Sequence, residues 1–231
     1  MREAIARADF HYQQLTPAEH DDVIRDVRAR LDSGDLSQVG EHRQDVWNTG
    51  WEENLEAFAA SGFELDSLVP RFIRTGPIVR LDQDYVRRVD PKFEFLFHDV
   101  VRRWLFLEYM SDVEAVYEFG SGSAYNLVAI SEMAPDIRLV GLDWAQSAVR
   151  LTNMIGKKRG LELTGRPFDF FHPTVDVELG ASTAAVTIHA LEQVGPRHEK
   201  FLQFLLAERP RVCVHIEPLL ELYDPDNVVD R

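Results

Sequence analysis

The chain has one cysteine, Cys213, among its 231 residues. A single thiol cannot form an internal disulfide, and it cannot supply the ligands of an iron–sulfur cluster or a cysteine-rich zinc site. The sequence also lacks an apolar run of membrane-span length, and residues 1–10 carry acidic side chains where a signal peptide has its apolar core. These absences favour a soluble cytoplasmic protein without a membrane partner.

Lysine is also scarce, and acidic residues outnumber basic ones. Lysine occurs four times, and the formal net charge is −14. Proteins that bind nucleic acids normally present a basic face to the phosphates. The basic run at residues 157–159 is expected on the solvated end of a helix, so the composition disfavours a nucleic-acid substrate.

The first 110 residues predict helices joined by irregular links. Thr16 and Glu19 flank a proline in the pattern of a capping box, which starts a helix that we expect to run to about Leu31. A second helix is expected at 51–60, and residues 70–86 are expected to be extended. A third helix, from Pro91 to about Tyr109, is apolar on so much of its surface that we expect it to be largely buried.

From residue 113 onward, apolar strand patterns alternate with amphipathic helix patterns. This alternation predicts an α/β fold with a doubly wound parallel sheet that helices cover on both faces. The expected strands are 114–119, 138–143, 161–168, 183–189 and 211–217, and the expected helices are 124–134, 146–159 and 198–208. Sheets of this kind usually contain further strands, so we expect the native chain to continue beyond residue 231.

The most informative motif lies where the first of these strands ends. Glu118 is followed by Gly120 and Gly122, and an amphipathic helix pattern begins directly after them. Glycine lets the backbone approach a ligand closely, and open α/β sheets bind nucleotides at this edge. The dinucleotide fingerprint requires a small residue where this chain has Tyr125, which argues against a nicotinamide-dependent oxidoreductase but leaves it as an alternative.

The motif resembles the first motif of class I S-adenosylmethionine-dependent methyltransferases, in which an acidic residue is followed by x-G-x-G-x-G. This chain departs from it only at Ala124, which replaces the third glycine. The resemblance covers residues 110–220. It implies a Rossmann-like domain at 111–231 that binds S-adenosylmethionine through Glu118, Gly120, Gly122 and Ala124. A purely structural tight turn remains the alternative for the two glycines.

The resemblance extends to the next two strand ends. Asp143 corresponds to the acid that holds both ribose hydroxyls, and Trp144 is expected to pack on the adenosine. Asp169 and Phe170 fit the positions that accept from the adenine amine and cover its ring. A helix N-cap remains the alternative for Asp143.

Histidine and acidic side chains follow the fourth and fifth strands. In the family that we infer, the loop after the fourth strand faces the transferred methyl group. His189 is therefore our candidate general base, and Glu192 our candidate orienting group. A buried structural histidine is the alternative. His215 and Glu217 form with His189 a His/His/Glu set that offers a metal site as a further alternative to ordinary hydrogen bonding.

We therefore predict a methyltransferase that acts on a small-molecule metabolite. Residues 1–110 of the protein are expected to form a helical cap that closes over the substrate. The side chains expected to anchor the substrate are Arg71, Arg74, Arg80, Tyr85 and Tyr125. Natural-product biosynthesis is the expected context. A catalytically inactive, methyltransferase-like partner protein is the other alternative, and the sequence leaves a homo-oligomer open.

Overall fold

The computed structural model describes residues 2–33, 39–69, 76–173, 177, 179–224 and 226. The chain forms two compact units, which we describe separately. The smaller unit comprises Met1–Gln38, Ile73–Val101 and Pro218–Arg231. The larger unit comprises Val39–Phe72 and Arg102–Glu217, and it contains the glycine motif and all four strand ends that the sequence singled out.

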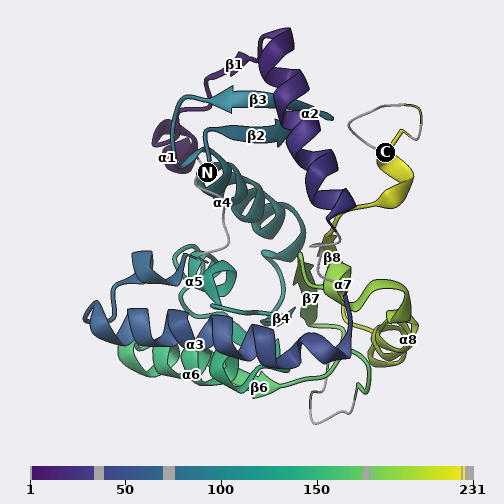
Figure 1. Ribbon diagram of the computed structural model, residues 1–231. Coiled ribbons are helices and arrows are strands. Elements are labelled where there is room, and N and C mark those ends of the chain that lie inside the picture. Colours follow the sequence, from purple (N-terminus) through teal and green to yellow (C-terminus); the bar gives the residue numbers. More distant parts are fainter. Residues whose placement is uncertain are drawn as a thin grey trace. The chain divides into compact units, whose positions relative to one another are not determined.

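A five-stranded parallel sheet forms the centre of the larger unit, in the order β6-β5-β4-β7-β8 (Figure 1). All five predicted strands are confirmed. Their bounds are β4 Ala115–Phe119, β5 Arg138–Asp143, β6 Leu163–Pro167, β7 Thr183–Ile188 and β8 Val212–Ile216. The chain moves from β4 outward to β6 and then returns to β7 on the other side of β4. The carboxyl ends of β4 and β7 therefore flank the point at which open α/β sheets bind ligands.

Helices cover one face of this sheet. They are α3 (Gln44–Ala60), α5 (Tyr125–Ser131) and α6 (Gln146–Arg159), and α3 lies along α6 (Figure 1). Because side chains alternate along a strand, Val116 of β4 packs into the core on this face, together with Phe58 and Leu127. Both helices predicted here from the α/β pattern, 124–134 and 146–159, are confirmed.

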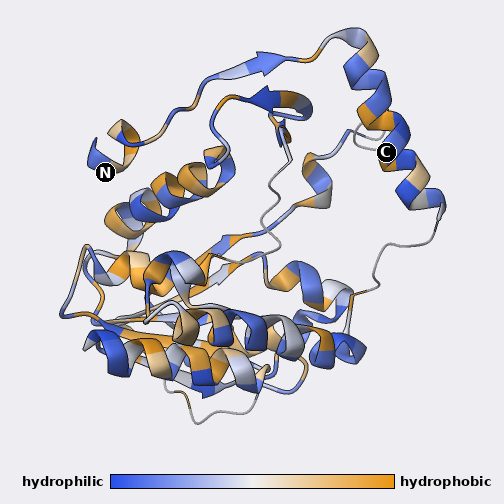
Figure 2. Cartoon of the chain, turned by 60° about the vertical axis from the view of Figure 1, so that its left-hand side comes forward, coloured by the Kyte–Doolittle hydropathy of each residue, from blue (hydrophilic) through white to orange (hydrophobic). Residues whose placement is uncertain are grey.

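The opposite face carries an aromatic core. Tyr117 and Phe119 of β4 point to this side and pack with Phe168, Phe201 and other residues of the same cluster. Phe201 belongs to α8 (Glu199–Glu208), which confirms the helix predicted at 198–208. A short helix, α7 (Leu191–Val194), joins β7 to α8 through a 3-10 turn. The strands of the sheet are the hydrophobic layer between these helices (Figure 2).

The start of α3 corrects the sequence analysis, which placed the helix at 51–60. The helix begins at Gln44 and passes through Gly50, a residue that disfavours a helix interior by about 1 kcal/mol relative to alanine. Trp47 and Trp51 lie one helical turn apart and stack on each other. Their packing outweighs the propensity of the single glycine.

The smaller unit contains a three-stranded antiparallel sheet in the order β1-β3-β2. Its elements are α1 (Arg2–Ala6), β1 (Tyr12–Gln14), α2 (Pro17–Asp32), β2 (Ile78–Leu81) and β3 (Asp84–Arg88). The described part of the segment expected to be extended, 76–86, is a hairpin whose turn holds Asp82 and Gln83 at positive φ. The capping box is confirmed, because the Thr16 N–H donates to Glu19 Oε2 at 2.9 Å.

The long apolar helix is present as α4 (Phe93–Leu105), which continues as one π-helical turn, Phe106–Met110. The prediction that it is largely buried is wrong. Phe93 and Phe106 are buried, whereas the exposed large apolar side chains include Phe97, Trp104, Leu107 and Tyr109. The apolar residues of this helix are interspersed with charged ones such as Glu94, Arg102 and Arg103, and most of its side chains are only partly buried. Of the described helices, none combines the length and apolar character of a bilayer span.

Candidate functional site

The glycine motif forms the turn between β4 and α5. Gly120, Gly122 and Ala124 all have positive φ, at 75°, 52° and 57°. This left-handed region costs an L-residue with a Cβ roughly 1–2 kcal/mol and costs glycine nothing comparable. The conformation explains why a third glycine would suit position 124, and it shows that Ala124 adopts the same backbone despite its methyl group.

Both glycines are also required by close packing of the chain's own side chains. A Cβ at Gly120 would overlap with the Cβ of Ala190, which follows β7. A Cβ at Gly122 would lie 2.5 Å from Cζ2 of Trp51 on α3. The turn is therefore closed by Ala190 on one side and by an indole ring on the other.

Asp143 joins the glycine turn to the end of β5. Its Oδ2 accepts from the Gly122 N–H and its Oδ1 accepts from the Ala145 N–H, both at 2.9 Å. The residue is only 5% exposed. Burial raises the pKa of the Asp143 carboxyl to about 6, while these backbone hydrogen bonds act in the opposite direction. The carboxylate thus joins the ends of β4 and β5, whereas the N-cap of α6 is Ala145, which makes no side-chain cap hydrogen bond, so the helix-cap alternative for Asp143 is not what the structure shows.

Glu118 is the second buried carboxyl, at the end of β4. Asn126 Nδ2 donates to its Oε1 at 2.5 Å, and its Oε2 has no hydrogen-bond partner among the described residues. Burial raises the pKa of Glu118 to about 8, and the nearby Arg102 guanidinium only partly offsets this. The group is protonated at neutral pH and lines a mainly apolar pocket beside Arg102 and Asn126.

The aromatic residues after β5 and β6 lie on different sides of the site, and the Phe170 ring is beside the glycine turn, 3.6 Å from a Cβ built on Gly120. Phe170 is 8% exposed and packs in the aromatic core against Phe201. Its neighbour Phe171 lies beside Trp144 instead, with ring centroids 5.7 Å apart. Asp169 accepts from the Phe171 N–H at 2.8 Å and so stabilises its own turn. The structure therefore places Phe171 beside Trp144 and Phe170 beside Gly120.

His189 and Glu192 lie together after β7. His189 has a φ of 54°, an uncommon conformation for a non-glycine residue, and its Nδ1 is 3.8 Å from Glu192 Oε2. Interaction with Glu192 raises the pKa of His189 above its ordinary value, although partial burial opposes the shift. The same contact lowers the pKa of Glu192. The predicted base and orienting group are thus neighbours.

The other two strand-end residues have hydrogen-bonding roles. Glu217 accepts from the backbone N–H groups of Ala190 and Glu192, at 3.1 and 3.2 Å. His215 Nδ1 is hydrogen bonded to the buried Thr187 hydroxyl at 2.8 Å, and partial burial lowers the pKa of His215. In the described part of the chain, no three His, Cys, Asp or Glu side chains are grouped as metal ligands would be. The structure does not assemble the His189, His215 and Glu217 metal set.

The residues predicted to anchor a substrate belong to both units. Arg80 and Tyr85 are paired neighbours in the β2–β3 hairpin of the smaller unit, and Arg80 stacks on the Tyr223 ring at 5.0 Å. Tyr125 begins α5 in the larger unit, where the Arg102 guanidinium lies 4.8 Å from its ring centroid. Arg71 and Arg74 lie outside the described residues.

Sequence reasoning missed the tryptophans of α3. Trp51 packs with Ala145 and Ala148 at the start of α6, and the partly buried Trp47 and Trp144 join this cluster. Arg43 lies over the Trp47 ring at 5.1 Å. The spacing of Trp47 and Trp51 by one helical turn is the signal that would have placed both on one face of a longer helix.

No family model and no curated protein sequence matches the chain. Solved structures do match. The [4+2]-cyclase SpnF is 16% identical, with a TM-score of 0.50 over 78% of this chain and 59% of that one. Coclaurine N-methyltransferase bound to N-methylheliamine and SAH is 11% identical, with a TM-score of 0.46 over 83% of this chain and 57% of that one. The chain thus spans less than three fifths of the length of both structures.

The strand order and the parallel register define a Rossmann-like α/β fold with a five-stranded parallel sheet, and the match to the [4+2]-cyclase SpnF supports the same fold. At such low identity the likeness concerns the fold alone. A cyclase shares it, and one fold hosts many reactions, so the function has to be argued from the site.

Proposed function

We propose that the protein is an S-adenosylmethionine-dependent methyltransferase for a small-molecule metabolite. The observation that carries the proposal is the hydrogen bond between the Gly122 N–H and the Asp143 carboxylate, 2.9 Å long. It joins a glycine turn after the first strand of the sheet to an acid after the second. Open α/β sheets bind nucleosides and nucleotides at such strand ends.

The chemistry of these residues fits the cofactor. A carboxylate has about four lone-pair positions, and the Asp143 carboxylate binds the backbone N–H groups of Gly122 and Ala145 and interacts with that of Trp144. The remaining lone-pair capacity would accept from a vicinal diol such as the ribose hydroxyls. Trp144 and Phe171 form an aromatic pair next to this carboxylate that suits a purine ring.

The remaining residues would then hold the acceptor and manage its proton. S-adenosylmethionine supplies an activated methyl group, and positioning donor and acceptor accounts for much of such catalysis. His189 is our proposed general base at the end of β7, with Glu192 orienting its ring. A metabolite of natural-product biosynthesis is our proposed substrate class, and Arg80, Tyr85 and Tyr125 are our proposed anchors for it.

Calorimetry with S-adenosylhomocysteine tests the cofactor site. We predict that Asp143→Ala weakens binding by about 1.5–3 kcal/mol, the scale of lost hydrogen bonds to a charged group. Asp136→Ala is the matched control, because Asp136 is an exposed acid just before β5. Thermal melts establish that both variants fold. Equal affinity of the folded Asp143→Ala variant and the control would remove Asp143 from the site, and binding of NAD in place of S-adenosylhomocysteine would favour the oxidoreductase.

A further inference from the structure

The indole of Trp51 occupies the space directly over Gly122. A Cβ built on Gly122 would lie 2.5, 2.7 and 3.0 Å from Cζ2, Cη2 and Cε2 of that ring. Trp51 is 9% exposed and stacks on Trp47, with ring centroids 6.0 Å apart. Any ligand that approaches the Gly122 backbone from this side needs the volume that the indole fills.

The carboxylate beside Gly122 is enclosed in the same way. Asp143 has free lone pairs but only 5% exposure, so a ribose diol cannot reach it while the surrounding side chains stay in place. Trp51 also packs against Ala145, the residue whose N–H binds Asp143. One side chain thus covers the glycine turn and packs against the residue next to the acid turn that the cofactor would use.

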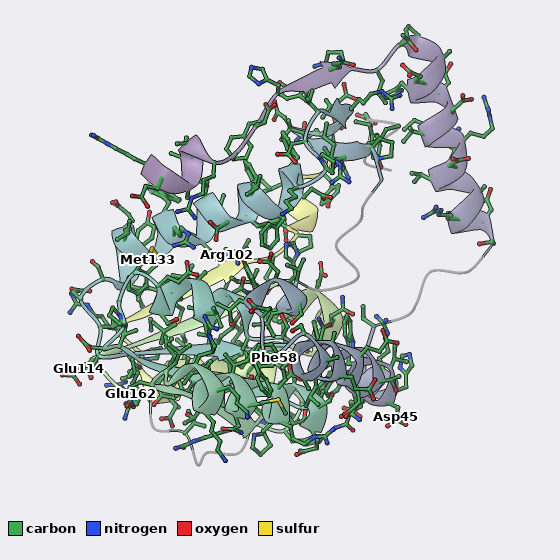
Figure 3. All side chains as sticks on the ribbon, turned by 90° about the vertical axis from the view of Figure 1, so that its left-hand side faces the viewer. Asp45, Phe58, Arg102, Glu114, Met133 and Glu162 are labelled. Carbon is green, nitrogen blue, oxygen red and sulfur yellow. The ribbon has the colours of Figure 1, made fainter. Side chains whose placement is uncertain are left out.

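The two halves of α3 are attached differently. The second half is fixed in the core: Phe58 is fully buried, and the buried Asn54 donates to the Ser67 carbonyl at 3.2 Å. Figure 3 labels Phe58 in this half and Asp45 near the exposed start of the helix.

Polar contacts hold the first half. Asn48 Oδ1 accepts from the Ser147 N–H at 3.1 Å, Gln44 donates to the Trp144 carbonyl at 3.3 Å, and Glu52 pairs with Arg150. The burial of the Trp51 indole against Ala145 and Ala148 adds to these polar contacts. Displacing the start of α3 must break both, so the open state is expected to be a minority.

Gly50 weakens the helix at the residue before Trp51. A Cβ built on it meets nothing within 4 Å, so packing does not require the glycine there. Glycine in a helix interior favours bending and local opening because it loses more backbone entropy than alanine. The weak point of α3 thus lies next to the indole that covers the site.

We propose that α3 is a lid on the cofactor site and that Trp51 must leave Gly122 before S-adenosylmethionine binds. The proposal rests on the proposed function. If the open state is a minority, the observed affinity of the cofactor is reduced by the open fraction, and a variant that favours the open state binds more tightly. A tryptophan that merely stacked on the bound cofactor would have the opposite effect when removed.

Calorimetry and stopped-flow binding of S-adenosylhomocysteine test the lid. We expect Trp51→Ala to bind roughly tenfold more tightly than the wild type, as for a site that is open about one tenth of the time. We expect Gly50→Ala to bind roughly three- to fivefold more weakly, because it strengthens the closed helix. Gly50→Ala keeps the proposal testable even if the Trp51→Ala variant does not fold.

Fluorescence provides a readout that is independent of affinity. S-adenosylhomocysteine should change the tryptophan emission of the wild type and of Trp104→Phe, which removes an exposed indole on α4. The comparison is made in a Trp144→Phe background, because Trp144 is itself proposed to contact the purine, and most of the remaining change should be absent when Trp51→Phe is added. The full remaining change after Trp51→Phe is added would overturn the lid, because the indole would not have moved.

Two further results distinguish failure of the lid proposal from failure of the proposed function. Equal or weaker binding by a folded Trp51→Ala variant would overturn the lid and leave the cofactor assignment intact. Absence of binding by the wild type and by folded Trp51→Ala alike would overturn the assignment itself, and the lid with it.

Discussion

Glu118 is a buried carboxyl whose protonation state differs between the folded and unfolded chain. Its pKa is raised from 4.5 to about 8. Between these values the unfolded chain has lost the proton and the folded chain keeps it, so stability falls as pH rises, by about 1.4 kcal/mol per pH unit. We predict that Glu118→Gln is more stable than the wild type at pH 8 by a few kcal/mol and similar at pH 4.5. Urea denaturation at both values measures this, and parallel pH profiles would contradict it.

His189 is expected to act as a base, so it must be neutral during turnover. Because Glu192 raises its pKa, the neutral form becomes dominant only above the ordinary value of 6.5, and the rate should rise with pH through that higher value. We predict that His189→Ala lowers turnover by roughly 10²–10⁴-fold and leaves S-adenosylhomocysteine affinity nearly unchanged. Glu192→Gln is the matched control.

In that control the rise in rate should move toward lower pH, because the carboxylate that raises the pKa of His189 is gone. Wild-type turnover that stays flat from pH 6 to 9, together with full activity of His189→Ala, would mean that positioning alone accounts for catalysis.

At the scale of single residues, the sequence predicted contacts between near neighbours in the chain, but not contacts between segments that are far apart in the sequence. His189 and Glu192 are three residues apart, and the structure places them together. Trp51 and Gly122 are far apart in the sequence, and nothing local in either segment indicates that the indole covers the glycine. Phe170 and Phe171 are both aromatic, so their pattern did not reveal which of them would face Trp144.

At the scale of single elements, two glycines with open space around them are predicted to behave oppositely. Gly160 ends α6 at a φ of +64°, whereas Gly50 lies inside α3, and a Cβ on either meets nothing within 4 Å. Gly160→Ala should therefore destabilise by about 1 kcal/mol through backbone strain, and Gly50→Ala should stabilise by a similar amount. Chemical denaturation of both variants measures the pair. A shift of the same sign in both would refute the backbone explanation.

The central strands β4, β5 and β7 were predictable because each is a buried apolar run between turn residues. The hairpin of β2 and β3 was not, since Asp82 and Gln83 take positive φ without a glycine to indicate the turn. The start of α3 was missed because Gly50 indicates a break that tertiary packing overrides. Local sequence patterns do not predict the bounds of an element when tertiary packing determines its conformation.

At the scale of the whole molecule, the sequence suggested a boundary near residue 110. The structure places Val39–Phe72 with the parallel sheet and Ile73–Val101 with the smaller unit. This division follows from Phe58 and Leu68, which are fully buried in the core beneath α3. The role of residues 1–110 as a cap over the substrate stays a prediction.

The central claim is that the carboxylate after β5 binds the ribose of S-adenosylmethionine once α3 has moved. A crystal structure of the protein with S-adenosylhomocysteine tests it most directly. We predict both ribose hydroxyls within hydrogen-bond distance of the Asp143 carboxylate and the Trp51 indole displaced from Gly122. A ribose bound elsewhere, with Asp143 bonded only to the Gly122 and Ala145 N–H groups, would contradict the claim.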